Sequence, residues 1–352
     1  MKAGTVVHQT LEAEVFTNVP VTVEGREEGW GLKIWNLLQG LEMLREEGRT
    51  RELAIWGLVG GEVVGGVIDQ VSFDSTDPVL EGKTVASKNA QMPGKNALKV
   101  GQTTLSGFLQ VQGGQNIDSA MGARGARQQL QPTFSQLPAT ADPNSSSLPS
   151  TADPGSSPSE ARKLYITDIK TRTAASLPRG ASFTPTKLQL MLYHRLLSSL
   201  LSGGFDFEQV TKHYGLNYHA PFSDGFIQQI AIMRPEHLDL ILSHNSIAGL
   251  WSLVGPALAR LGRVEVSDVL CAEYRDSQTG DLRGTTTFSY DSVLLDSYVR
   301  EEMNWWKGER RARGVVVQEA WKCRSCEFAD GCEWRRGKVD AAVAKARRGR
   351  KE

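Results

Sequence analysis

Two side chains of opposite charge, Asp168 and Lys170, lie two positions apart in the stretch Lys163–Arg172. This stretch is rich in β-branched and aromatic residues, which predicts a short strand. Side chains of a strand alternate between its two faces, so the carboxylate and the ammonium group share one face. Such a pair can hold a divalent metal ion and position a water molecule beside it. We therefore expect metal-assisted hydrolysis at this strand.

A second carboxylate, Asp69, ends the apolar run Val63–Ile68, which also predicts a strand. A lone aspartate at the end of a strand is usually a cap or a turn residue. Asp69 becomes a candidate only through its expected pairing with Asp168, because two carboxylates can share a metal ion.

A helix is expected from Thr184 to about residue 201, with Thr184 as its N-cap and Pro185 in its first turn. Gln189 and Tyr193 are four residues apart and share one face of this helix. By themselves they are ordinary helix residues. Together with the carboxylates and Lys170 they form the hypothesis of a single site.

Three of the four cysteines follow the pattern C-x2-C-x5-C, at Cys323, Cys326 and Cys332. Thiolates at this spacing can chelate one metal centre, but zinc and iron–sulfur clusters both need a fourth ligand. The fourth cysteine, Cys271, lies in an expected strand at what looks like a core position. So few cysteines argue against a secreted disulfide scaffold and favour a reducing compartment.

The charge of the 352-residue chain is balanced overall but unevenly distributed. Residues 307–352 carry 14 Lys/Arg against 7 Asp/Glu, a net charge of +7, and the first 306 residues carry −7. A basic C-terminal end suits a polyanion such as nucleic acid, although the part from Arg335 onward also reads as a solvated tail. We expect no membrane span, because no run of about 18 apolar residues occurs.

The remaining pattern predicts helices alternating with antiparallel strand pairs. Helices are expected at 4–16, 28–47 and 291–307, strand pairs at 51–59 with 62–73 and at 264–275 with 282–290, and a mostly helical region at 205–262. His8 and Glu12 are four residues apart in the first helix, and from the residues alone a surface pair is the expected interpretation. The pattern favours an α/β fold with a small mixed sheet flanked by helices.

Residues 74–158 are rich in Ser, Gln, Gly, Ala, Pro and Thr and contain an eleven-residue tandem repeat, 137–147 followed by 148–158. Such a composition buries too little surface to offset the entropy of ordering. We expect a disordered insertion within an antiparallel strand pair. The two strands can still pair across it, because the entropic cost of closing a loop grows only slowly with its length. The alternative is a boundary between two domains, which would leave Asp69 and Asp168 unrelated.

The whole set resembles the exonuclease V family, within the RecB-like branch of the PD-(D/E)xK nuclease superfamily. The matching stretches are Gly4–Glu12, Gly66–Asp69, Asp168–Arg172, Gln189–Tyr193 and Glu319–Arg335. The resemblance implies a restriction-endonuclease-like α/β core with a helical region and a C-terminal cysteine cluster segment. It divides the chain into 1–73 (first part of the nuclease core), 74–160 (insertion), 161–310 (rest of the core with the helical region), 311–336 (cysteine cluster segment) and 337–352 (basic tail).

The resemblance also implies residue roles. His8, Asp69 and Asp168 would bind Mg2+, and Lys170, with the two aspartates, would be catalytic. The DNA-binding residues would be Arg172, Gln189 and Tyr193. Cys323, Cys326 and Cys332 would be three ligands of a [4Fe–4S] cluster that fixes the C-terminal end to the N-terminal side of the core.

In this family the first cluster cysteine lies upstream of the helix that bears the histidine, and this sequence has no cysteine before Cys271. We expect that the sequence lacks an N-terminal stretch carrying the fourth ligand, with Cys271 as the alternative. A structural metal centre contributes directly to folding, so the cluster also bears on stability.

The function implied is exonucleolytic hydrolysis of single-stranded DNA by a monomer that acts in repair or genome maintenance in the nucleus or the mitochondrion. A single-strand-binding protein would be its partner. Two alternatives stay open: a non-catalytic DNA-binding module that keeps the fold, and a zinc-bound interaction domain. Trp305, Trp306 and Trp334 are candidates for stacking on bases, although tryptophans at helical spacing more often belong to a core.

Overall fold

The structure is a computed structural model of the chain, and it describes residues 17–90, 133–136 and 161–348 except 312 and 316. The expected N-terminal helix, with His8, and most of the expected insertion lie outside these residues.

A five-stranded mixed sheet forms the centre of the molecule, with the strand order β2-β3-β5-β6-β7. Only β5 and β6 are parallel; the other neighbours are antiparallel. The expected α/β core with a small mixed sheet is confirmed, and so is the antiparallel pairing of the strands on either side of the insertion. The strands are β2 (Arg49–Val59), β3 (Glu62–Ser72), β5 (Arg162–Arg172), β6 (Val264–Asp276) and β7 (Leu282–Ser289).

Two long helices, α2 (Arg26–Glu47) and α5 (Thr184–Leu201), pack against the sheet. Glycines allow both to approach β2 closely. A Cβ atom on Gly40 of α2 would lie 2.8 Å from the Leu53 side chain, and one on Gly57 of β2 would lie 2.6 Å from Leu196 of α5. The residue at the expected N-cap, Thr184, is instead the first residue of α5, and Phe183 is the N-cap.

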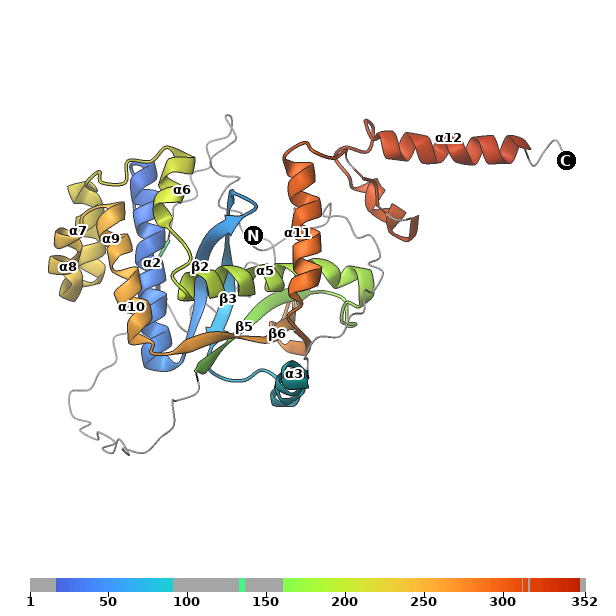
Figure 1. Ribbon diagram of the computed structural model, residues 1–352. Helices are drawn as coiled ribbons and strands as arrows, with labels where there is room; N and C mark the ends of the chain where they lie inside the picture. The colour runs from blue at the N-terminus through green and yellow to red at the C-terminus, as the bar shows by residue number, and fades with distance from the viewer. Residues whose placement is uncertain (1–16, 91–132, 137–160, 312, 316, 349–352) are drawn as a thin grey trace.

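Short helices follow α5 and pack around α2 (Figure 1). Their buried side chains, among them Phe207, Phe226 and Leu250, join the same core as α2 and the sheet, which confirms the expected helical region. The helices are α6 (Phe207–Tyr214), α7 (Asp224–Met233), α8 (Leu238–Ser243), α9 (Ile247–Ser252) and α10 (Val254–Arg260).

The segment expected to be disordered begins with a helix, α3 (Pro78–Ala90). The Tyr165 hydroxyl donates to the Glu81 carboxylate at 2.6 Å, and Lys163 forms an ion pair with Glu81 at 3.0 Å. Tyr165 follows the core residue Leu164 in β5, so α3 covers the face opposite α5 (Figure 1). Composition missed α3 because contacts with the sheet, rather than its own residues, supply its stability.

A second short strand lies within the expected insertion. β4 (Thr133–Gln136) pairs in antiparallel fashion with β1 (Thr17–Pro20), apart from the main sheet. The expectation of disorder from 74 to 160 is therefore wrong for residues 74–90, which include α3, and for β4, whereas residues 91–132 and 137–160 lie outside the described part of the chain.

The C-terminal part consists of α11 (Ser292–Trp306), the 3-10 helix η4 (Val317–Arg324) and α12 (Glu333–Arg348). Figure 1 shows α12 pointing away from the sheet. The basic stretch expected as a tail is thus helical up to Arg348, and from Arg335 on its described side chains are exposed. No described helix has the length and apolar character needed to cross a membrane.

Candidate active site

Asp69 and Asp168 meet where β3 and β5 separate. The pairing between these strands ends at Gln70 and Thr167, one residue before the two aspartates would face each other. There the Ile169 N–H donates to Asp69 Oδ2 at 2.5 Å. The Asp69 side chain takes the place of the next backbone hydrogen bond of the ladder, which keeps its carboxylate beside Asp168.

An irregularity in β3 makes this position special. Ile68 and Val71 are both fully buried in the same core, although they are three positions apart. The strict alternation of a strand is therefore broken between them. On the neighbouring strand β2, Glu52 has φ +50°. It is skipped in the β2–β3 register at the place where its partner would be Asp69. Both strands therefore depart from regular geometry beside the candidate ligand.

Lys170 and Asp168 share one face of β5, as predicted, and form an ion pair there. Lys170 Nζ donates to Asp168 Oδ1 at 2.9 Å, and Asp168 is 1% exposed. Burial lowers the pKa of Lys170, but the nearby carboxylates of Asp168 and Asp69 outweigh it, so that its pKa lies above the ordinary value. The ammonium group stays charged, which suits it to stabilise negative charge on a substrate and makes it a poor base.

The second oxygen of the Asp168 carboxylate, Oδ2, is buried and has no hydrogen-bond partner within the described residues. An unsatisfied buried oxygen of a charged group is costly. A hard cation such as Mg2+ prefers carboxylate oxygens and would relieve that cost. No group of three or more His, Cys, Asp and Glu side chains in the described part of the chain is arranged to hold a metal ion, and His8 lies outside that part.

Gln189 and Tyr193 of α5 also border the site. Gln189 Nε2 donates to the Tyr193 hydroxyl at 2.8 Å. The Tyr193 ring lies so close to β3 that a Cβ atom on Gly66 would be 2.5 Å from it. Burial raises the pKa of Tyr193, and the Asp168 charge adds to the rise. The structure thus brings this pair to the carboxylates, as predicted.

Tyr274 of β6 belongs to the same place and was missed by the sequence reasoning. It pairs with Lys170 in the parallel β5–β6 register and is 2% exposed. The guanidinium carbon of Arg172 lies 5.9 Å from its ring centroid. The hairpin that contains Tyr274 was predicted, but no local signal gives the register of one strand against a distant parallel neighbour.

The cysteines do not come together as a set of four. Cys271 pairs with Thr167 inside the sheet and is 3% exposed, so the predicted core position is confirmed, and burial raises the pKa of its thiol to about 11. Cys323, Cys326 and Cys332 lie in the C-terminal segment between α11 and α12, which Figure 1 shows at a distance from the sheet. Thiols suit a metal centre by their chemistry, but the structure does not arrange these three, or any other described group of three or more such side chains, to hold a metal ion.

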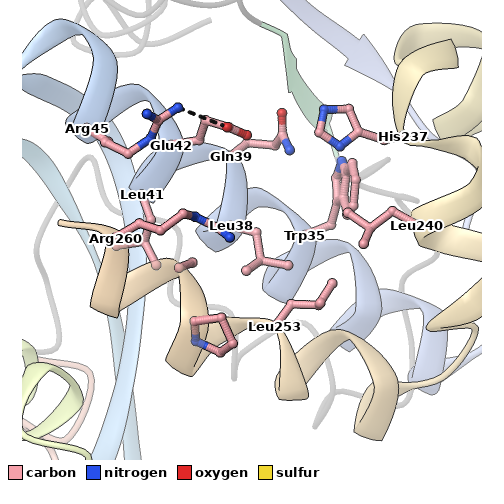
Figure 2. Close-up of a pocket in the computed structure, with 12 residues that line it drawn as sticks. Trp35, Leu38, Gln39, Leu41, Glu42, Arg45, His237, Leu240, Leu253 and Arg260 are labelled. Atoms are coloured by element: carbon pink, nitrogen blue, oxygen red, sulfur yellow. Dashed lines mark hydrogen bonds and ion pairs between the residues drawn. The ribbon is translucent and has the colours of Figure 1, made fainter.

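A separate cavity of about 120 Å³ lies between α2 and the helices α8 and α10 (Figure 2). Gln39 lines it; this side chain is 2% exposed, and its Oε1 has no hydrogen-bond partner within the described residues. The apolar part of the lining includes Trp35, Leu38, Leu41, Leu240, Leu253 and Ala257.

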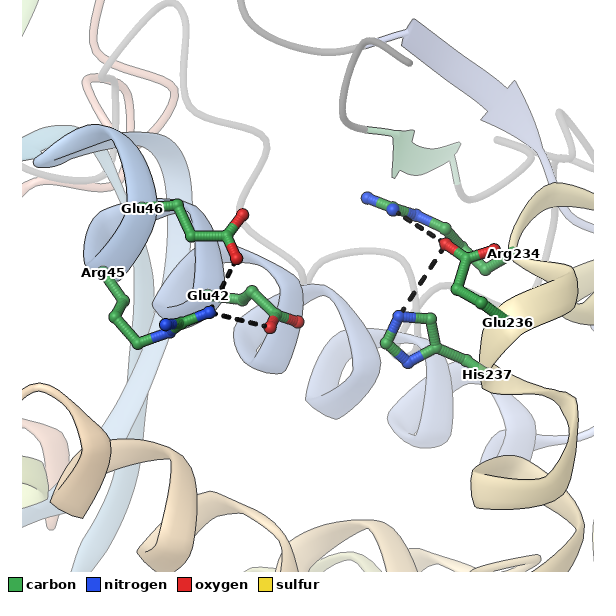
Figure 3. Close-up of polar contacts among 6 residues, drawn as sticks. All are labelled: Glu42, Arg45, Glu46, Arg234, Glu236 and His237. Carbon is green, nitrogen blue, oxygen red and sulfur yellow. Dashed lines mark hydrogen bonds and ion pairs between the residues drawn. The ribbon is translucent and has the colours of Figure 1, made fainter. Parts of the chain in front are cut away.

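Acidic groups near this cavity form ion pairs (Figure 3). Arg45 contacts Glu46 at 2.6 Å and Glu42 at 3.5 Å, and Arg234 contacts Glu236 at 3.1 Å. Each of these carboxylates already faces an arginine, unlike Oδ2 of Asp168. Hydrolytic chemistry is therefore better assigned to the site at β3 and β5.

A comparison with protein families shows to which family the chain belongs. A family model described as "Exonuclease V - a 5' deoxyribonuclease" matches residues 1–335 of the chain. The chain belongs to the exonuclease V family. The match includes every residue of the candidate site and all four cysteines.

Individual relatives are distant. The chain is 21% identical to Exonuclease V of Danio rerio over 353 residues, which cover 98% of the chain and 64% of the relative. It is 23% identical to the mitochondrial Exonuclease V of Candida dubliniensis and 22% identical to that of Candida albicans. Each of these two alignments covers 256 residues and 52% of the chain, with 41% and 42% of the relative. The chain thus spans less than two thirds of the length of the curated relatives.

Proposed function

We propose that this protein is a Mg2+-dependent exonuclease that hydrolyses single-stranded DNA. The main support for this proposal is the buried oxygen Oδ2 of Asp168. This atom has no hydrogen-bond partner within the described residues, and the other oxygen of the same carboxylate forms an ion pair with Lys170. Membership of a family described as a 5' deoxyribonuclease supports DNA as the substrate. The PD-(D/E)xK assignment rests on Asp69, Asp168 and Lys170, which occur in the expected order on adjacent antiparallel strands.

The residues would divide the work as follows. Asp69 and Asp168, with His8, would hold the metal ion, and a bound Mg2+ supplies polarisation of the scissile phosphate and a water of lowered pKa. Lys170, held at Asp168, would orient the attacking water and stabilise negative charge that develops on the phosphate. Tyr193 and Gln189, which are hydrogen-bonded to each other, would contact the DNA strand and hold it close to the two carboxylates.

Single-strand binding has two supports outside the site. The C-terminal 46 residues carry a net charge of +7, which suits weakly selective, salt-dependent binding of a phosphate backbone. Trp305 and Trp306 at the end of α11 are 37% and 63% exposed. They are therefore available to stack on unpaired bases, rather than being core residues as their spacing alone suggested.

Substitution of the buried aspartate tests the proposal. In Asp168→Asn, the amide keeps the shape of the carboxylate but loses its charge. We expect a loss of at least about 100-fold in Mg2+-dependent release of nucleotides from a labelled single strand, because a metal ligand is removed. Binding of the same strand in EDTA should change less than threefold. Asp239→Asn, on the remote helix α8, is the matched control and should keep full activity.

If Asp168→Asn retains wild-type cleavage, the site is wrongly assigned. If the wild-type protein binds the strand but does not cleave it with any divalent ion, the protein is a non-catalytic DNA-binding module. Blocking one strand end at a time with a bulky label would show which end is attacked.

We also propose that Cys323, Cys326 and Cys332 supply three ligands of a [4Fe–4S] cluster. Their spacing and thiol chemistry support this, but three ligands fall short of the usual four, so no step of the mechanism is derived through the cluster. Metal analysis of anaerobically purified protein distinguishes iron with sulfide from zinc. Cys332→Ser should lose the metal, whereas Cys271→Ser should retain it.

The names of the Candida relatives support a mitochondrial location, and we propose the mitochondrion, with the nucleus as the second compartment. We further propose that the protein acts as a monomer with a single-strand-binding protein as its partner. Fractionation of cells that express a tagged chain tests the location, and light scattering tests the oligomeric state.

A further inference from the structure

Two buried donors beside the candidate metal site, the Nε–H of Arg172 and the O–H of Tyr274, have no hydrogen-bond acceptor within the described residues. Arg172 lies two residues beyond Lys170 on β5, and Tyr274 is the partner of Lys170 on β6. The three side chains therefore share one face of the sheet. Buried donors without acceptors are costly, so their clustering indicates that a ligand with acceptor oxygens completes them.

The carboxylate best placed to pair with Arg172 is engaged elsewhere. Asp276 is the partner of Arg172 in the β5–β6 register. Its side chain instead accepts hydrogen bonds from Arg283 and from the backbone of Gln278 and Thr279, and these bonds lower its pKa. The acceptor that Arg172 needs has to come from outside this network.

The first turn of α5 adds positive potential at the same place. Burial raises the pKa of Tyr274, and the Thr186 hydroxyl in that first turn, which donates toward the tyrosine oxygen, lowers it. The helix terminus therefore lies beside the tyrosine, whose own O–H has no acceptor within the described residues. The N-cap residue Phe183 provides no side-chain hydrogen bond to the terminus. The uncapped end of an 18-residue helix favours an anion, because its first N–H groups and its dipole point outward.

We propose that Arg172, Tyr274 and the first turn of α5 form a phosphate subsite, which holds the backbone phosphate next to the scissile one. This inference rests on the proposed function and extends it. The guanidinium Nε–H and the tyrosine O–H donate to non-bridging oxygens of that phosphate. Arg172 lies two residues, about 7 Å, further along β5 than Lys170, so it serves a different phosphate from the one at Asp168.

A scan with neutral linkages tests the subsite. Labelled oligothymidylates, each with one methylphosphonate linkage, are bound to the full chain in EDTA, and affinity is measured by fluorescence anisotropy. For wild type, we expect one linkage near the attacked end at which loss of charge weakens binding about tenfold. In Arg172→Gln, the unmodified strand should bind about tenfold more weakly, and the same neutral linkage should have almost no further effect.

The tyrosine is tested by Tyr274→Phe, which removes only the hydroxyl. We expect affinity to fall about threefold to tenfold, the usual range for one neutral hydrogen bond, and coupling to the same linkage in a double-mutant cycle. Tyr298→Phe on α11 is the matched control and should bind like wild type. Thermal unfolding of each variant distinguishes loss of contact from loss of fold.

Additive effects of Arg172→Gln and every neutral linkage overturn the subsite, and so does Tyr274→Phe binding like wild type at all linkages. The outcome is separable from the proposed function because binding in EDTA needs no catalysis. If Arg172→Gln is coupled to one neutral linkage but the wild-type protein cleaves no strand, the proposed nuclease activity is refuted and the phosphate subsite is supported. If Asp168→Asn loses cleavage while the effects of Arg172→Gln and of every neutral linkage are additive, the nuclease activity is supported and the phosphate subsite is refuted.

Discussion

The backbone N–H of Ile169 donates to the carboxylate of Asp69 at 2.5 Å, across two strands that are 100 positions apart in the chain. A side-chain oxygen here replaces a carbonyl of the sheet ladder. The bond fixes the Asp69 carboxylate one residue from Asp168 without using a metal ion. The candidate site is therefore partly preorganised by the sheet itself, which is the arrangement that electrostatic catalysis requires.

The ion pair of Lys170 and Asp168 should show strong coupling in stability. Lys170→Met leaves a buried carboxylate without its cation, and we expect it to lower the free energy of unfolding by about 3 kcal/mol. Adding Asp168→Asn should restore most of that loss, because the uncompensated charge is gone. Urea unfolding of the two single variants and the double variant measures the coupling. Equal and additive losses would show that the pair is not coupled in the folded protein.

Docking of α3 should depend on pH through Glu81. Burial alone would raise the pKa of Glu81, but hydrogen bonds from Tyr165 and Lys163 outweigh it and lower the pKa below 4.5. A carboxyl whose pKa is lowered on folding contributes stability above its unfolded pKa and loses it as the pH falls through the folded value. Protection of α3 from hydrogen exchange should therefore decrease below about pH 4.5.

The same bond should also weaken in alkali. Burial and the Glu81 bond raise the pKa of Tyr165 to about 12, so its contribution is complete below pH 10 and disappears as the pH rises toward 12. Glu81→Gln should remove the acid dependence, and Tyr165→Phe should remove the alkaline one. Identical acid profiles for wild type and Glu81→Gln would contradict this assignment.

The contact between Gly66 and Tyr193 should tolerate no added methyl group. In Gly66→Ala the new Cβ would lie 2.5 Å from the tyrosine ring, which forces α5 away from β3. We expect a loss of about 1 to 3 kcal/mol in the free energy of unfolding and at least tenfold lower cleavage. Gly82→Ala in α3 is the matched control, because its Cβ would meet nothing within 4 Å. It should be neutral or slightly stabilising, since alanine favours helix.

The positive φ of Glu52 predicts a difference between two substitutions. Glu52→Gly and Glu52→Ala both remove the side chain, but only glycine adopts φ +50° without cost. We expect the glycine variant to be more stable than the alanine variant by about 1 kcal/mol, measured by urea unfolding. Because Glu52 lies across from the irregularity at Asp69 in the register, both variants should also be assayed for cleavage. An alanine variant as stable as the glycine variant would mean that the backbone relaxes at this position.

Much of the fold was predictable because its signals are local. The apolar pattern gave α2, α5, α11 and the strands β2, β3, β5, β6 and β7 to within a few residues. The helix α3 was missed because its apolar pattern is weak. Its position is stabilised by Glu81 and Asp77, which bind Tyr165 and Thr287 on the distant strands β5 and β7. Such long-range bonds leave no mark in composition.

The sequence by itself determined which candidate side chains share a face: Asp168 and Lys170 do because a strand repeats every two residues, and Gln189 and Tyr193 do because a helix repeats every 3.6. Only the tertiary structure decided where Asp69 points, which strand lies beside Lys170, and that Tyr274 and Arg172 meet there. Registers between strands far apart in the chain depend on the packing of the whole sheet against α2 and α5, so no local pattern specifies them.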